Sequence, residues 1–222
     1  LANFHGIEVN DFACCVARTA LWIAEKQADI NTAKVVKRVY DELPLKEYGT
    51  IIHGNSLRVD WADACPAHRL SYIIGNPPFI GYSNLNDAQK ADRADIFGKS
   101  GGVLDYVACW YKKAADFTRG THVRCAFVST NSICQGQQVE PLWRPLFDDG
   151  VEIDFAHKTF VWNSEATDEA HVHVVIVGFS REKIAKKTIF DGDGARKADN
   201  ISGYLSATPS LFIARRSSPI CD

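Results

Sequence analysis

Short apolar runs alternate along this chain with longer segments in which apolar residues recur every three to four positions. The runs are typical of buried strands, and the longer segments are typical of amphipathic helices. The expected strands are residues 4–8, 50–53, 71–75, 123–128, 151–156 and 172–179, and the expected helices are residues 12–27, 32–42, 88–97, 103–119 and 139–147. This alternation predicts a doubly wound α/β fold, with a mostly parallel sheet and helices on both faces.

Polar side chains follow three of the expected strands at the points where these strands end. Glu8 ends the first strand, Asn55 and Ser56 follow the second, and Asn76 follows the third. Ligands of open α/β sheets bind beyond the carboxyl ends of the strands, and a carboxylate at that place commonly accepts hydrogen bonds from ribose hydroxyls. An acidic residue just before a helix also stabilises the helix dipole, so Glu8 has a structural interpretation beside the ligand-binding one.

The stretch GNPPF, residues 75–79, carries the most specific chemistry in the chain. The Asn76 side-chain oxygen and a neighbouring backbone carbonyl can both accept hydrogen bonds from one exocyclic amine, which makes its nitrogen a better nucleophile. Pro77 and Pro78 have no backbone N–H and hold φ near −65°, so the carbonyl is kept in place. The Phe79 ring can stack on the base that carries the amine. The plainer interpretation is a turn that ends a strand, with a core phenylalanine.

Composition narrows the class of protein. The 222 residues are enough for one large domain or one domain with appendages, with 46% hydrophobic and 23% charged residues and a net charge of −2. No apolar stretch approaches the length needed to span a bilayer. The seven cysteines never occur as CxxC, which favours a reduced, cytoplasmic protein. His171 and His173 have no ligands at zinc spacing nearby, so no metal site is expected.

The GNPPF stretch resembles motif IV, N/D-P-P-Y/F/W, of the amino-group methyltransferases that use S-adenosylmethionine. The wider pattern resembles the adenine-N6 DNA methyltransferases, especially the methylase region of large single-chain type II restriction–modification enzymes. The segments that carry this resemblance are, in order, GIEVNDFACCVARTALWIAEKQ, IIHGNSLRVDW, IIGNPPFIG, GVLDYVACWYKKAA, CAFVSTNSICQGQQV and HKTFVWNSEATDEAHVHVVIVGF. The cofactor segments precede the catalytic tetrapeptide.

On the cofactor side, the resemblance implies that Glu8 binds the ribose of S-adenosylmethionine. Asn55 stands where many relatives have an aspartate near the cofactor adenine, and Ser56 is beside it. This departure removes a charge but keeps a hydrogen-bond acceptor.

On the target side, the resemblance assigns Asn76, Pro77, Pro78 and Phe79 to the catalytic tetrapeptide. The target is an adenine that has been flipped out of double-stranded DNA. The downstream aromatic pair that packs on the other side of this base is represented by Phe160 and Trp162, in TFVW between two expected strands. Core aromatic residues at a hairpin are an equally weighted interpretation of this pair. Asn131 and Gln135, in the loop after strand 123–128, are expected to line the same cleft.

The resemblance also implies parts that the printed sequence does not contain. The family's glycine-rich cofactor loop precedes the position of Glu8, and the chain has neither that loop nor a methionine. We expect residues 1–182 to form a methyltransferase core without its first strand, and residues 183–222 to lead toward a target-recognition region. We expect further domains of the same polypeptide, a sheet with two open edges, and no detectable methyl transfer by these 222 residues alone.

Other functions share the tetrapeptide. They include methylation of cytosine N4, of an RNA base or of a protein glutamine. A different class of function is a catalytically inert nucleic-acid-binding module with the same fold. The intact motif at residues 76–79 argues against an inert module, which needs none of the four residues.

Overall fold

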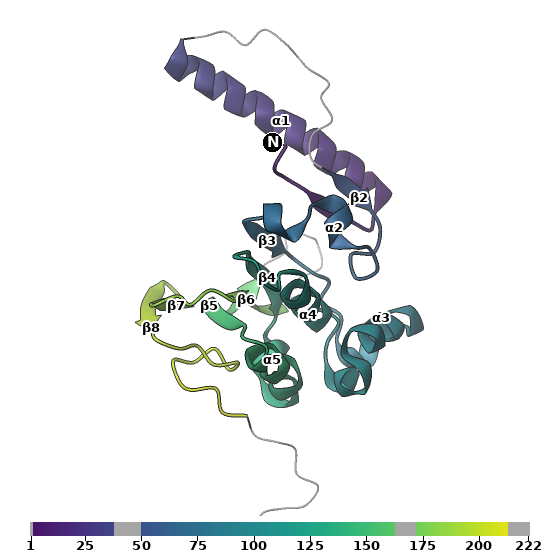
Figure 1. The fold of residues 1–222 in the computed structure, drawn as a ribbon, viewed down its shortest axis with the longest axis vertical. Helices are drawn as coiled ribbons and strands as arrows, with labels where there is room; N and C mark the ends of the chain where they lie inside the picture. The colour runs from purple at the N-terminus through teal and green to yellow at the C-terminus, as the bar shows by residue number, and fades with distance from the viewer. Residues whose placement is uncertain (1, 38–49, 163–171, 213–222) are drawn as a thin grey trace, which may run out of the picture. The chain divides into compact units, whose positions relative to one another are not determined.

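The computed structural model of the chain describes residues 2–37, 50–162 and 172–212. Two compact units are present, Leu1–Arg69 and Leu70–Asp222, here called the N-terminal and the C-terminal unit (Figure 1). No helix in these described stretches is long and apolar enough to cross a bilayer.

The N-terminal unit is built from one helix and a pair of parallel strands. Strand β1 (Gly6–Glu8) pairs with β2 (Ile51–His53), and α1 (Asp11–Val36) follows β1 directly. The short helix α2 (Trp61–Ala64) completes the unit. Asn10 caps α1, because its side-chain oxygen accepts a hydrogen bond from the Ala13 N–H at 3.0 Å.

Helix α1 differs from the sequence-based expectation in two ways. It runs without a break to Val36, where two helices were expected, because no glycine or proline lies between residues 27 and 32. The apolar stripe that begins with Phe12 and Val16 is exposed, by 77% and 50%, whereas Cys14 is fully buried. The two strands of three residues each offer one narrow face, and Cys14 lies against it, with its thiol 3.6 Å from the Glu8 carbonyl oxygen.

The C-terminal unit contains a six-stranded sheet in the order β3-β4-β6-β5-β7-β8. Its strands are β3 (Tyr72–Gly75), β4 (Arg124–Thr130), β5 (Glu152–Trp162), β6 (Val172–Ser180), β7 (Lys187–Asp191) and β8 (Gly194–Ala198). The strand pairings make β3, β4, β5 and β7 run in one direction and β6 and β8 in the other. The carboxyl ends of the first four therefore lie at one edge of the sheet.

Helices and short 3₁₀ segments connect these strands. The helices are α3 (Asp87–Phe97), α4 (Ala108–Phe117) and α5 (Val139–Asp148). A cluster of aromatic rings forms the centre of the core, with Tyr111 of α4 in ring contact with Phe127 of β4, Trp143 of α5 and Phe179 of β6. All four side chains are almost completely buried. Burial on this scale is the main stabilising contribution in such a unit.

Strand β3 was expected to be buried, and this expectation is wrong for the described structure. The side chains of Tyr72 and Ile74 are 69% and 81% exposed. The reason is its place in the sheet, since β3 is the edge strand and pairs only with β4 among the described residues. An apolar run alone does not distinguish an edge strand from a central one.

Residues beyond 182 contribute to the same sheet. Strand β7 pairs in parallel with β5, and β8 pairs with β7. Ile201 and Leu205, in the segment that follows β8, are almost completely buried. The domain boundary expected at residue 182 stays a prediction, although these elements pack with those that precede it.

One buried acid makes the stability of the C-terminal unit depend on pH. Burial raises the pKa of Asp154 in β5, although the Ser180 hydroxyl, which donates to its Oδ1 at 3.0 Å, opposes the shift. Below the pKa that Asp154 has in the unfolded chain, the carboxyl is protonated in both states and costs no stability. As the pH rises through the higher pKa of the folded protein, the buried carboxyl must ionise, and the folded state loses stability. We expect Asp154→Asn to raise the thermal unfolding midpoint at pH 7.5, with a gain that shrinks as the pH falls toward about 4. The midpoints are measured by calorimetry, and a lower midpoint at pH 7.5 would contradict the prediction.

Candidate active site

The loop that carries the GNPPF motif leaves the sheet at the edge where β3, β4, β5 and β7 end. Gly75 pairs with Phe127, and β4 continues three residues further, to Thr130. A Cβ atom on Gly75 would lie 3.3 Å from the Phe127 ring, which is tighter than most contacts of this kind. A glycine at this position therefore lets β3 pass directly over the buried ring just before the motif begins.

Within the motif, the side chains differ in exposure. Asn76 is exposed, and none of its side-chain atoms makes a hydrogen bond to another described residue. Pro77 is buried, Pro78 is exposed and Phe79 is half-buried. The buried proline anchors the loop, so the free amide of Asn76 is presented from a fixed backbone.

The loop after β4 lies at the same edge. Residues Asn131–Cys134 form a 3₁₀ helix, and the carbonyl oxygen of Asn131 accepts a bond from the Cys134 thiol at 3.0 Å. Asn131 is half-buried and Gln135 is exposed. These two candidate residues therefore belong to a structured turn beside the end of β4.

Phe160 and Trp162 lie within β5, which corrects the expectation that they occupy a connection between two strands. Phe160 pairs with Val174 of β6, and its half-buried ring contacts His157 edge to face, with centroids 6.4 Å apart. Trp162 pairs with Val172 at the end of the strand. His171, one of the two histidines considered above as metal ligands, falls outside the described residues.

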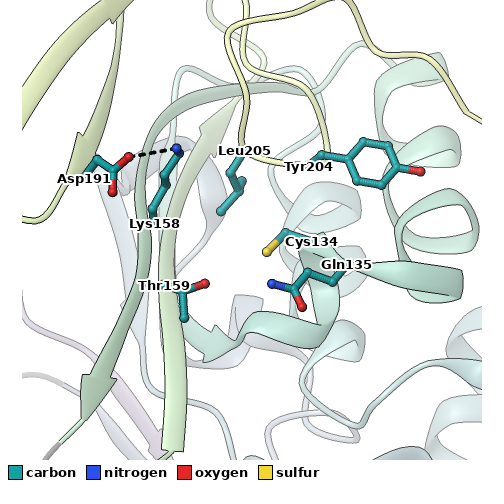
Figure 2. Close-up of a pocket in the computed structure, with 7 residues that line it drawn as sticks. All are labelled: Cys134, Gln135, Lys158, Thr159, Asp191, Tyr204 and Leu205. Atoms are coloured by element: carbon teal, nitrogen blue, oxygen red, sulfur yellow. Dashed lines mark hydrogen bonds and ion pairs between the residues drawn. The ribbon is translucent and has the colours of Figure 1, made fainter.

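A cavity of about 260 Å³ opens at this edge between β5, the loop after β4 and the segment after β8 (Figure 2). The residues that line it are Cys134, Gln135, Lys158, Thr159, Asp191, Tyr204 and Leu205. Lys158 and Thr159 both face it because the pairing of β5 with β6 is irregular between His157 and Phe160. The Lys158 ammonium forms an ion pair with Asp191 at 2.8 Å.

The chemistry of this cavity is polar, and its one thiol is inert. Burial raises the pKa of Cys134 to about 11, so the thiol stays protonated at neutral pH and is no nucleophile. Sequence patterns indicated Gln135 as a lining residue but missed Lys158, Thr159 and Tyr204. Thr159 is the first residue of the TFVW segment and Lys158 directly precedes it, so their closeness to Phe160 is the one signal that could have indicated these two residues.

In the N-terminal unit, strand pairing brings Glu8 beside the turn that follows β2. Glu8 pairs with His53, and its carbonyl oxygen accepts from the Gly54 N–H at 2.8 Å. One carboxylate oxygen of Glu8 accepts from the Asn10 N–H at 2.9 Å. The other has no hydrogen-bond donor among the described residues, so it is available to a ligand.

Asn55 organises its own turn. Its side-chain oxygen accepts from the Leu57 N–H at 2.9 Å, and its carbonyl oxygen accepts from the N–H groups of Arg58 and Val59. The Trp61 indole donates to the carbonyl oxygen of Ser56 at 2.7 Å. These bonds give Asn55 a structural role in the turn that follows β2.

The structure thus groups the candidate residues within each unit. Glu8, Asn55 and Ser56 lie together in the N-terminal unit. The GNPPF loop, the turn at 131–135 and Phe160 lie at one sheet edge of the C-terminal unit.

Comparison with known proteins gives close matches over the whole chain. Residues 1–191 match the family described as MmeI, DNA-methyltransferase domain. DNA methyltransferase A of Bacillus subtilis (strain 168) is 40% identical over 228 residues, which cover 100% of this chain and 26% of that protein. The chain therefore spans about a quarter of the length of this curated relative.

Solved structures give the same result. The type IIL restriction–modification enzyme MmeI in complex with DNA matches with a TM-score of 0.94 and 40% identity, over 100% of this chain and 31% of that one. A complex of DrdV with DNA is similar in fold alone, with a TM-score of 0.54 and 15% identity over 85% of this chain and 21% of that one. The expected S-adenosylmethionine-dependent methyltransferase fold is thereby confirmed. The match of residues 1–191, together with 40% identity to both relatives, shows that this chain belongs to the MmeI DNA-methyltransferase domain family.

Proposed function

We propose that this chain forms the target-amine and ribose-binding parts of a DNA methyltransferase of a restriction–modification system, which methylates N6 of adenine. The observation that carries the proposal is the GNPPF loop. Its Asn76 amide is exposed and unbonded among the described residues, on a backbone anchored by the buried Pro77. Family membership supports the reaction class.

The residues of the loop act on the amine. The Asn76 Oδ1 atom and the Pro77 carbonyl oxygen each accept one hydrogen bond from the exocyclic NH₂ group, so its lone pair is drawn out of conjugation with the ring. The Pro77 carbonyl oxygen accepts no backbone N–H among the described residues, which leaves it available. The half-buried Phe79 ring stacks on the base. These groups act by positioning and by stabilising the positive charge that develops on nitrogen.

S-adenosylmethionine, which the family implies, supplies an electrophilic methyl group on its sulfonium sulfur. The chain fits part of this cofactor, because one Glu8 carboxylate oxygen is free among the described residues at a strand end. The turn of Asn55 and Ser56 lies beside it. In this proposal Glu8 accepts hydrogen bonds from the ribose hydroxyls, and Asn55 and Ser56 line the adenine side.

The partner in this proposal is double-stranded DNA with its target base flipped out. Phe160 and Trp162 hold the base on the face opposite Phe79, and Asn131 and Gln135 contact the same nucleotide. Residues 1–182 act as the catalytic core, and residues 183–222 lead toward target recognition by other parts of the polypeptide. The open edge of β3 is the place where a further strand of the catalytic core would pair.

Methyl transfer from labelled S-adenosylmethionine to DNA tests the proposal. The natural polypeptide that contains this chain is expected to yield N6-methyladenine, and the 222 residues alone are expected to give no detectable incorporation. The modified nucleosides are released by hydrolysis and separated by chromatography. N4-methylcytosine as the product would exclude adenine as the target, and label only in RNA or protein would exclude DNA. No label in any of them would indicate an inert binding module.

A further inference from the structure

A buried carboxylate, Asp105, joins two loops of the candidate active site. It precedes α4 and is only 6% exposed. Its Oδ1 atom accepts from the Tyr82 N–H at 2.8 Å, and its Oδ2 atom accepts from the Ser132 hydroxyl at 2.5 Å. Residues 76–82, here called the target-amine loop, are thereby tied to residues 131–135, here called the β4 loop.

The backbone around Asp105 strengthens the same connection. The Tyr106 N–H donates to the carbonyl oxygen of Ile80 in the target-amine loop at 2.9 Å. The Asp105 N–H donates to the buried side-chain oxygen of Gln138, just beyond the β4 loop, at 3.0 Å. Asp105 and its neighbour thus bond twice to the target-amine loop and twice to the region after β4.

Two residues of helix α3 also hold this segment. The Tyr106 hydroxyl donates to the buried Asp92 carboxylate at 2.6 Å, and the Arg93 guanidinium donates to the Leu104 carbonyl oxygen at 2.8 Å. Residues 104–106 are therefore held on both flanks of Asp105. Such a support limits how far the carboxylate can follow either loop.

No cation lies within ion-pair distance of the Asp105 carboxylate in the described structure. Burying a charge without a counter-ion is costly, and an apolar residue of similar size is often at least as stabilising. The two bonds to the loops therefore indicate a role in the site beyond stability. We propose that Asp105 is a positioning residue, which fixes the target-amine loop against the β4 loop so that Asn76 meets the amine in the reactive geometry. The effect on methyl transfer rests on the function proposed above.

The hydrogen bonds allow a test that separates geometry from charge. In Asp105→Asn, the amide oxygen accepts from the Tyr82 N–H and the amide nitrogen donates to the Ser132 oxygen. Ser132 then donates to the Thr130 hydroxyl, 2.7 Å away, where either oxygen can be the donor. Both loop connections survive without the charge, whereas Asp105→Ala removes both.

Amide hydrogen exchange of the 222-residue chain measures the bond between Asp105 and the Tyr82 N–H directly, and it does not require enzymatic activity. Protection of the Tyr82 N–H is expected to fall at least tenfold in Asp105→Ala and to stay within threefold of the wild type in Asp105→Asn. Asp95→Ala, which removes an exposed carboxylate from α3, serves as the control. Unchanged protection in Asp105→Ala would overturn the proposal.

Steady-state kinetics of the natural polypeptide that contains this chain test whether the position of the target-amine loop affects methyl transfer. Asp105→Ala is expected to lower kcat about 10²-fold, with the KM for S-adenosylmethionine little changed, since misplacement by about 1 Å has this effect. Asp105→Asn is expected to restore kcat to within about fivefold, because the geometry is restored. An equal loss in both variants would show that the charge acts in the chemistry and would overturn the positioning role.

Ser132→Ala keeps the proposal testable where Asp105→Ala fails to fold. It removes the bond to the β4 loop and leaves the bond to Tyr82. A smaller loss of kcat is expected, and the double variant Asp105→Asn with Ser132→Ala is expected to lose less than the product of the single effects. Additive effects would overturn the proposed coupling. If the wild type transfers no methyl group to adenine, the proposed function fails, while the exchange measurement still decides whether Asp105 positions the loop.

Discussion

Replacing Asn76 with alanine is expected to lower kcat for methyl transfer by about 10²–10³-fold, the cost of removing one preorganised hydrogen-bonding group from a developing charge. Asn76 is exposed, and its side chain has no hydrogen bond among the described residues, so its loss leaves no buried group unsatisfied. The KM for S-adenosylmethionine is expected to change less than threefold. The measurement is steady-state methylation of DNA by the natural polypeptide that contains this chain.

Two further variants serve as controls for Asn76→Ala. Asn76→Asp keeps an acceptor oxygen in the same place and is expected to retain more activity than Asn76→Ala. Asn84→Ala removes an exposed amide from the segment just beyond the target-amine loop and is expected to be neutral. A kcat for Asn76→Ala within threefold of the wild type would exclude Asn76 from the chemistry.

The elements that the sequence predicted correctly are those whose signals are local. The two prolines at 77 and 78 end β3 at Gly75 because they remove backbone donors and fix φ. Five of the eight residues at 172–179 are β-branched, and β6 occupies Val172–Ser180. In both places one physical cause, acting within a few residues, decides the structure.

Long-range effects explain what could not be predicted. The run Tyr72–Ile74 has the composition of a central strand, yet β3 is an edge strand because its only described partner is β4. The apolar stripe of α1 gave no information on which face packs, because the small Cys14 reaches Glu8 while Phe12 is exposed. Pairing partners and packing distances depend on residues far away in the sequence.

In the candidate site too, local signals could be predicted and long-range contacts could not. The GNPPF motif was identified because four adjacent residues carry its chemistry. The bonds of Asp105 to Tyr82 and Ser132 span 23 and 27 positions, so no local pattern indicates them. Asp191 meets Lys158 in the cavity across 33 positions, which is equally invisible in the sequence.

The packing of Trp143 predicts the largest loss of stability. Its side chain is 0% exposed, its ring contacts Tyr111 and Phe147, and its indole N–H donates to the Ile133 carbonyl oxygen at 2.8 Å. Trp143→Ala is expected to lower the free energy of unfolding by about 3–5 kcal/mol, because it creates a cavity and leaves a buried carbonyl without its donor. The measurement is urea denaturation of the 222-residue chain, in which the unfolding transition of the C-terminal unit is followed.

Trp143→Phe separates the two causes, because the ring remains while the N–H donor is lost. It is expected to be the milder variant, with a loss of about 1–3 kcal/mol. Trp22→Ala, which removes a half-exposed indole from α1, is expected to change stability by less than about 0.5 kcal/mol. A loss below about 1 kcal/mol in Trp143→Ala would contradict the role of Trp143 in the core.

The bond from Trp143 also links stability to the proposed chemistry. Ile133 lies in the β4 loop, directly after the Ser132 that donates to Asp105. Trp143→Phe is therefore expected to lower kcat about tenfold at a temperature where the protein is still fully folded, since small displacements of a positioned group are costly. An unchanged kcat would show that the β4 loop keeps its place without the Trp143 bond, and Asp105 would then hold that loop without support from the core.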